Sequence, residues 1–137
     1  MMKKEIVRDP LFLSQVSQAA TKADVGIGQD LRDTLEANRA GCVGLAANMI
    51  GVARRVIIVN MGVIDVVMYN PVMVSYSNPY QTEEGCLSLS GTRPTIRYKD
   101  IEVEFFDQDW KKQRLHLSGF PAQICQHELD HLEGRLI

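Results

Sequence analysis

The residues most suited to chemistry in this chain lie close to its last residue, in the segment Gln126-His127-Glu128-Leu129-Asp130-His131. Helical residues four apart lie about 40° apart around the axis and one turn apart along it, so His127 and His131 can both bind one ion. Glu128 projects in a neighbouring direction, where a carboxylate can take a proton from water activated by that ion. The pattern therefore predicts a metal site with a general base. The alternative is a pair of surface histidines on an amphipathic helix.

Two imidazoles leave at least a third ligand to be found, and the residues that follow His131 do not offer one. Glu133 lies about 200° around the helix from His131 and faces away, so the third ligand is expected upstream. The strongest candidates there, ahead of the carboxylates, are one histidine and three cysteines, namely His116, Cys42, Cys86 and Cys125.

The surroundings of these four candidates differ. His116 alternates with leucines in an expected strand, which favours an exposed position, and Cys125 lies on the wrong side of the helix, which favours the core. Cys42 lies in a Gly-rich segment and remains a candidate on spacing alone. Cys86 is favoured, because Gly85 and the nearby serines predict an irregular backbone that can direct a thiol at the helix.

Composition narrows the class of protein. The 137 residues, 45% of them hydrophobic, suffice for one domain spanning 1–137 whose core needs no disulfide. A net charge of −2 gives no reason to expect nucleic acid or an anionic membrane as the main partner. We expect no membrane span and no secretory signal, because charges interrupt the apolar runs. Three cysteines in such a chain predict reduced thiols and a cytoplasmic location.

Helices are expected at both ends of the chain. One begins at Pro10 with Asp9 as its cap, and a second spans 29–39. The first is expected to form a single apolar face from Leu11, Val16, Ala19 and Ala20. A final helix at 122–134 carries the histidines and ends at Gly134.

Strands are expected between these helices. β-branched residues and alternation of apolar with charged residues predict four of them, at 54–62, 65–76, 101–106 and 114–117. Gly62 separates the first two, which predicts a hairpin or meander. Helices, then strands, then a last helix predict an α+β domain.

Three segments resemble the motifs of the peptide deformylases, in family order and at similar separations. They are "GLAANMIG" at 44–51, "EGCLS" at 84–88 and "QHELDHLEG" at 126–134, with "DPLF" near the start extending the resemblance over nearly the whole chain. That family removes the formyl group from the N-terminal formyl-methionine of new bacterial and organellar proteins. The resemblance implies an α+β fold with two N-terminal helices, in which antiparallel sheets surround a central C-terminal helix carrying H-E-x-x-H.

The resemblance also implies a set of site residues. Cys86, His127 and His131 correspond to the metal ligands and Glu128 to the general base and acid. The backbone N–H of Leu87 corresponds to one oxyanion donor. The family uses one divalent ion, ferrous iron by preference, and tolerates zinc, nickel or cobalt.

An N-formylmethionyl peptide is the substrate that the resemblance implies. The family holds it by strand-like backbone hydrogen bonds and buries its methionine in an apolar pocket. The corresponding residues are Val43, Gly44, Leu45, Glu84, Arg93, Phe120 and Ile124. Leu45, Phe120 and Ile124 fit an ordinary core equally well. Nothing in the sequence indicates ribosome binding.

The chain departs from the first family motif at the residue that should donate the second oxyanion hydrogen bond. Met49 replaces a glutamine there, and a thioether donates no hydrogen bond. Losing one such donor typically costs about a hundredfold to a thousandfold in turnover. Smaller departures are Cys42 for glycine, Ser90 for proline and Gln123 for arginine.

Three interpretations of Met49 remain open. The neighbouring Asn48 can supply the missing amide if the loop is irregular, or the enzyme works slowly with its remaining donors. In the third, the site binds metal for another purpose: the protein recognises nascent N-termini without hydrolysis, or it acts on another acyl group.

Overall fold

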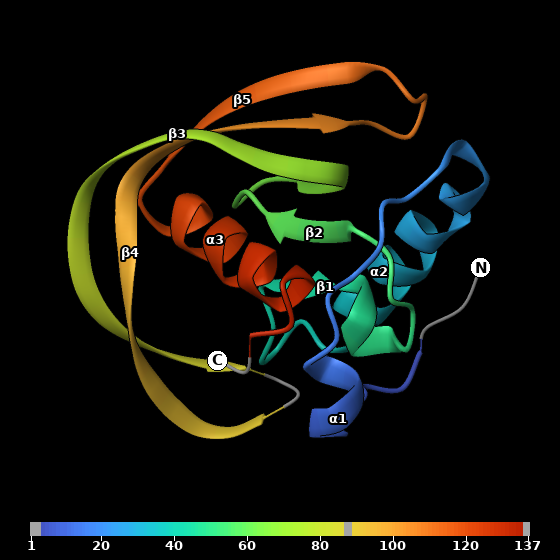
Figure 1. The fold of residues 1–137 in the computed structure, drawn as a ribbon, viewed down its shortest axis with the longest axis horizontal. Coiled ribbons are helices and arrows are strands. Elements are labelled where there is room, and N and C mark those ends of the chain that lie inside the picture. Colours follow the sequence, from blue (N-terminus) through green and yellow to red (C-terminus); the bar gives the residue numbers. More distant parts are fainter. Residues whose placement is uncertain (1–3, 87–88, 136–137) are drawn as a thin grey trace.

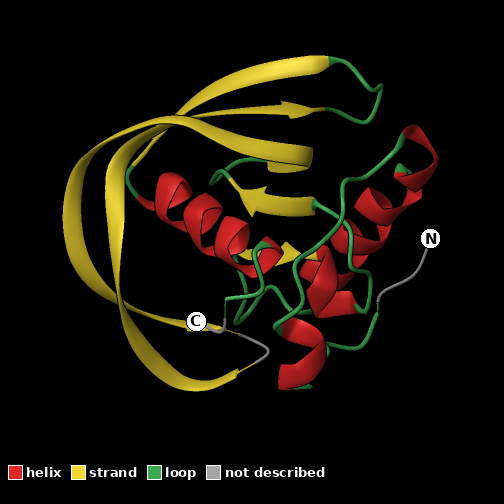
Figure 2. Ribbon diagram, viewed as in Figure 1, coloured by secondary structure: helices red, strands yellow, loops and turns green. Residues whose placement is uncertain are grey.

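The structure is a computed structural model that describes residues 4–86 and 89–135. Its elements in chain order are α1 (Pro10–Leu13), the 3-10 helix η1 (Lys22–Asp24), α2 (Gly26–Ala37), β1 (Gly44–Ala46), the 3-10 helix η2 (Ala47–Ile50), β2 (Val56–Asn60), β3 (Asp65–Cys86), β4 (Leu89–Phe106), β5 (Lys112–Ser118) and α3 (Phe120–Leu132). Figure 2 shows the strands grouped on one side and most of the helical segments on the other. The predicted α+β class is confirmed.

The strands form one antiparallel sheet with the order β1-β2-β3-β4-β5. β3 and β4 are long, and their pairing shifts register between Tyr69 and Val72 and again between Met73 and Ser75. Such bulges bend a strand and increase its twist. The β3–β4 hairpin therefore curves around α3, which lies in the hollow of the sheet (Figure 1).

The core lies between the concave face of the sheet and the helices. Four consecutive residues of β2, 56–59, are all buried, as expected for a strand covered on both faces. α2 buries Leu31 and Leu35 on one face, while α3 buries residues at nearly every position from Ala122 to Leu132. This burial explains why α3 can hold polar side chains in a fixed geometry.

The predicted strands are confirmed, with β3 and β4 longer than expected, and so is the final helix. Gly62 takes a positive φ of 96° between β2 and β3, as a tight connection requires. The second helix begins three residues earlier than predicted. Residues 101–106 alternate as expected, with Ile101, Val103 and Phe105 buried.

The prediction of a long first helix is wrong. α1 is a single turn that ends at Leu13, and Val16 is 62% exposed. The following backbone is extended because its groups bond to other segments: the N–H of Ser17 donates to Leu132 O, and that of Gln18 to Ala53 O. A helix would have to break these long-range hydrogen bonds, so tertiary pairing overrides local propensity.

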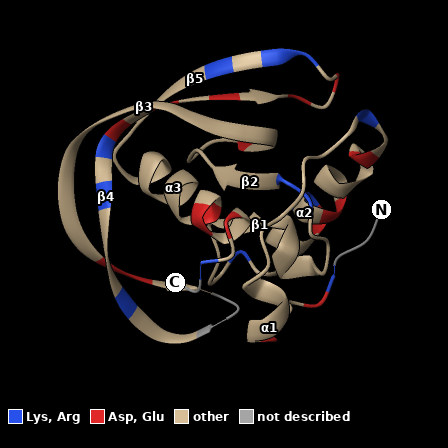
Figure 3. Cartoon of the chain, in the orientation of Figure 1, with Lys and Arg blue, Asp and Glu red and all other residues tan. Residues whose placement is uncertain are grey.

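Lys and Arg positions are interspersed with Asp and Glu positions along the chain (Figure 3). On β5, for example, Arg114 pairs with Glu102 and Glu104 of the neighbouring strand. Within the described residues, no helix combines the length and apolar character needed to cross a membrane.

Candidate metal centre and active site

The end of β3 and one face of α3 bring three metal-ligating side chains together. His131 Nε2 lies 3.1 Å from His127 Nε2 and 3.2 Å from Cys86 Sγ. All three ligand atoms lie within 4.8 Å of one another. Around a tetrahedral ion with bonds of about 2.0–2.3 Å, ligand atoms lie about 3.3–3.7 Å apart. The three residues therefore fit a metal ion with a coordination position left open.

The other candidates for the third ligand lie elsewhere. His116 is on β5 and contacts Ser118 at the surface, whereas Cys125 is fully buried in the core. Cys42 lies at the wall of the neighbouring cavity, where its thiol donates to Gly44 O at 3.0 Å. Burial raises the pKa of the Cys42 thiol to about 12. That thiol is therefore neutral, unlike a metal ligand.

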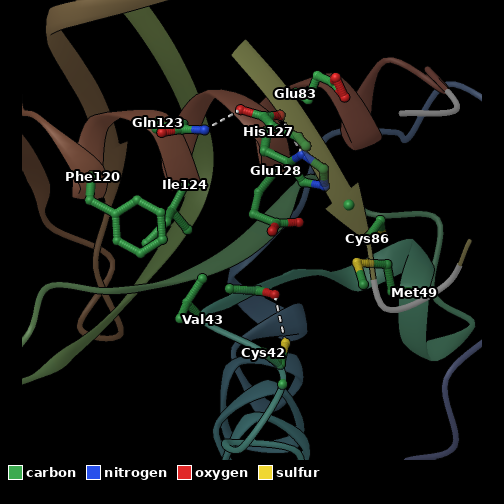
Figure 4. A pocket seen from close by; sticks show the side chains of 14 residues that line it. Cys42, Val43, Met49, Glu83, Cys86, Phe120, Gln123, Ile124, His127 and Glu128 are labelled. Carbon is green, nitrogen blue, oxygen red and sulfur yellow. Dashed lines mark hydrogen bonds and ion pairs between the residues drawn. The ribbon is translucent and has the colours of Figure 1, made fainter. Parts of the chain in front are cut away.

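Glu128 points from α3 into this cavity (Figure 4). The residue is 4% exposed, and its Oε1 has no hydrogen-bond partner among the described residues. Burial raises the pKa of this carboxyl to about 7, which is suited to both accepting and releasing a proton near neutral pH. Gly44 leaves it room, because a Cβ there would lie 3.1 Å from Glu128 Oε2 and 2.6 Å from Ile124 Cγ2.

The cavity has a volume of about 250 Å³. Its wall comprises Gly41, Cys42, Val43, Gly44, Met49, Glu83, Glu84, Gly85, Cys86, Phe120, Gln123, Ile124, His127 and Glu128. Phe120 and Val43 are 59% and 41% exposed, so apolar surface borders the opening. The result is a mixed site in which an apolar side chain can bind beside Glu128 and the candidate metal ligands.

The predicted substrate-binding residues divide into two groups. Five of them line the cavity: Val43, Gly44, Glu84, Phe120 and Ile124. Leu45 instead has a fully buried side chain in the core. Arg93 pairs with Glu84 in the register of β3 and β4 and donates to Ser90 O. Leu87, the predicted backbone donor, lies outside the described residues.

Comparison with known proteins agrees with this geometry. The family model for polypeptide deformylase matches residues 3–137. The peptide deformylase of Clostridium beijerinckii is 52% identical over 136 residues, which cover 99% of this chain and all of that protein. The chain belongs to the polypeptide deformylase family. Its deformylase activity and its metallohydrolase class follow from that membership.

Solved deformylase structures have the same fold. A class I type b peptide deformylase from Acinetobacter baumannii with Met-Ala-Ser bound superposes with a TM-score of 0.87 at 27% identity, covering 99% of this chain and 97% of the other. The Thermotoga maritima enzyme gives the same TM-score at 28% identity, with coverages of 99% and 95%. The predicted arrangement of an antiparallel sheet around the H-E-x-x-H helix is therefore confirmed.

In this deformylase fold, Glu84 supports His127, one of the predicted metal ligands. Its Oε1 lies 2.7 Å from His127 Nδ1, and its two oxygens accept from Arg97 at 2.7 and 2.9 Å. Burial alone raises the pKa of Glu84, but the hydrogen bonds from His127 and Arg97 outweigh it and lower the pKa to about 2. An ionised carboxylate accepts the Nδ1 proton, which leaves Nε2 of His127 free to bind metal.

Two residues that sequence reasoning did not assign complete this network. Arg97, only 4% exposed, also donates to Asp130 Oδ2 at 2.6 Å and so links β4 to α3. Gln123, at the position where the family often has arginine, donates to Glu84 Oε2 at 3.0 Å. One feature of the sequence could have indicated the role of Arg97: it is a basic residue on the same strand face as Ile101 and other core residues.

The residues at the end of the first deformylase motif are both buried. Met49 lines the cavity, and its Sδ accepts the N–H of Ala46 at 3.4 Å. Asn48 donates one amide hydrogen to His131 O at 2.9 Å. This contact directs the amide toward the end of α3. The structure therefore gives Asn48 a hydrogen-bond partner other than a substrate in the cavity.

Proposed function

We propose that this chain deformylates N-formylmethionyl peptides with one divalent ion held by Cys86, His127 and His131. A thiolate and two imidazoles suit iron, zinc, nickel or cobalt, and ferrous iron is the ion expected from the family. When bound, such an ion acts as a Lewis acid that polarises the formyl carbonyl and lowers the pKa of water. The observation that carries the proposal is that three clustered ligand atoms lie beside a buried carboxylate at the wall of one cavity.

Glu128 acts as the general base and acid in this proposal. Its carboxylate faces the cavity and takes a proton from the attacking water as the new C–O bond to the formyl carbon forms. It then returns this proton to the amide nitrogen as the C–N bond breaks. The products are formate and a peptide with a free amine. Glu128 needs no rearrangement for either transfer, because its Oε1 has no competing partner within the described part of the chain.

The peptide binds along β1. This strand is at one end of the sheet order and, among the described strands, pairs with β2 alone, so its other edge can accept an extended peptide by strand addition. The methionine side chain of the peptide then enters the cavity between Val43, Phe120 and Ile124. The Acinetobacter baumannii structure with bound Met-Ala-Ser supports a peptide of this kind as the ligand.

Met49 makes this enzyme slower than a deformylase that has the family glutamine. The Met49 thioether is part of the cavity wall and can only accept hydrogen bonds. Among the chain's own groups the oxyanion therefore loses one side-chain donor, which leaves backbone N–H groups to donate to it. We also propose that the reaction takes place in the cytoplasm, where the thiols of the three cysteines in this sequence stay reduced.

The decisive experiment is formate release from formyl-Met-Ala-Ser by protein loaded anaerobically with ferrous iron. We expect turnover that falls at least about a hundredfold in Glu128→Gln, which keeps the side-chain size but cannot accept the proton. Metal content, measured in both proteins, should be equal. Parent turnover no faster than that of Glu128→Gln would show that the site binds metal without hydrolysis. Cleavage of acetyl-Met-Ala-Ser in preference to the formyl peptide would assign a different acyl group.

A further inference from the structure

Three buried polar atoms around the C-terminal end of α3 have no hydrogen-bond partner among the described residues. They are Ser17 Oγ, Asn48 Oδ1 and His131 Nδ1. The three residues are 4%, 1% and 0% exposed, respectively. Buried polar atoms are almost always hydrogen-bonded to protein or to ordered water. Three residues with such atoms at one end of α3 therefore indicate a polar site.

Hydrogen bonds bring the three residues to the same end of α3 although they come from distant parts of the sequence. Asn48 Nδ2 donates to the carbonyl of His131 at 2.9 Å, and the N–H of Ser17 donates to the carbonyl of Leu132 at 2.8 Å. These are consecutive carbonyls of one helical turn, about 100° apart around the axis. Figure 1 shows the N-terminal segment and the region after β1 close to this end of α3.

The chemistry of the three atoms is complementary. His131 Nε2 faces Cys86 and His127, so as a metal ligand the ring carries its proton on Nδ1 and needs an acceptor there. The Oδ1 of Asn48 is an acceptor, and the hydroxyl of Ser17 both donates and accepts. One water molecule that accepts from His131 and donates to the other two satisfies all of them.

We propose that Asn48 and Ser17 hold an internal water against His131 Nδ1, and that this polar site sets the affinity of His131 for the metal ion. The inference rests on the proposed metal-binding function. The two imidazole ligands are thus oriented differently, His127 by the carboxylate of Glu84 and His131 by neutral groups. Asn48 is then a positioning residue and does not donate to the oxyanion.

The first test measures Co²⁺ affinity of the full chain by anaerobic competition with a chelator. Asn48→Leu removes both amide groups at similar volume, and Ser17→Ala removes only the hydroxyl. Both should weaken Co²⁺ binding, Asn48→Leu by about 10- to 100-fold. Thr34→Val is the matched control, because Thr34 is also fully buried but donates to Asp30 O on α2. Affinities of both site variants within twofold of the parent, or an equal loss in Thr34→Val, would overturn the inference.

A second readout separates this role from catalysis. In Zn²⁺-loaded protein with ¹⁵N-labelled histidine, we expect a slowly exchanging proton on His131 Nδ1, and faster exchange in Ser17→Ala, which keeps the amide contact to the helix. Lower turnover with unchanged Co²⁺ affinity in Asn48→Leu would instead make Asn48 an oxyanion donor. If the parent released no formate but Asn48→Leu still weakened Co²⁺ binding, only the proposed function would fail.

Discussion

The inner face of β4 has two parts with opposite chemistry. Toward the end of the strand it presents Ile101, Val103 and Phe105 to the apolar core. Four residues before Ile101, the same face presents Arg97, which is just as deeply buried but bonds to Glu84 and Asp130. Strand alternation thus accounts for the burial of Ile101, Val103 and Phe105, although Lys99, two residues before Ile101, is exposed. What lies opposite each residue determines whether it is apolar or charged.

The two parts stabilise the fold in different ways. In the core part, removal of apolar surface from water contributes free energy without requiring a particular geometry. In the site part, buried charges lose their hydration, and only complete pairing offsets that cost. The site part therefore holds its side chains in one arrangement, which a metal ligand such as His127 needs, but it tolerates substitution poorly.

Arg97→Met should disturb the site part of β4 more than any other change discussed below. It leaves the carboxylates of Glu84 and Asp130 buried with fewer partners, so we expect unfolding free energy to fall by about 3–5 kcal/mol in denaturant titrations. Co²⁺ affinity should fall as well, because Glu84 loses two of its hydrogen bonds. Arg114→Met is the control: its ion pairs are exposed and screened by solvent, so the loss should be much smaller. Equal losses in the two variants would contradict the distinction between paired charges in the site and on the surface.

The sequence predicted the core part of the fold well, because alternation and residue type agree there. Ile101, Val103 and Phe105 alternate with charged residues, and all three are buried as expected. The grouping of Cys86 with two histidines on the last helix was likewise predicted, because few residue types can complete such a ligand set. Its assignment as the working metal site remains a prediction.

Other features could not be read from the sequence, because they depend on distant partners. Val16 was expected on a helical face, but the neighbouring Ser17 pairs its backbone with Leu132 at the other end of the chain. Arg97 shares a strand face with Ile101, but its charge argues against burial, and the partners that permit burial lie on β3 and α3. The direction of the Asn48 side chain likewise depends on where the last turn of α3 packs against η2.

Met49→Gln sharpens the comparison between apolar and polar positions. Met49 is an apolar side chain at the position where the family has a hydrogen-bond donor. We expect turnover of formyl-Met-Ala-Ser to rise by about 10- to 100-fold, or about 1.4–2.7 kcal/mol in the activation barrier. The new amide can donate to the oxyanion, which the thioether cannot do. Met49→Leu, which restores no donor, should leave the rate near that of the parent. A Met49→Gln variant no faster than Met49→Leu would mean that the other groups already saturate oxyanion stabilisation.

Ile101→Val tests the core part with the smallest change. Removal of one buried methyl group from a fully packed position should cost about 0.5–1.5 kcal/mol of unfolding free energy. Co²⁺ affinity and formate release should both stay within twofold of the parent, because Ile101 belongs to the apolar core, four residues along β4 from Arg97. Chemical denaturation and chelator competition on the same preparation measure both quantities. If the loss of this methyl group also weakened Co²⁺ binding, the two parts of β4 would be mechanically coupled, and the charged network would depend on core packing for its geometry.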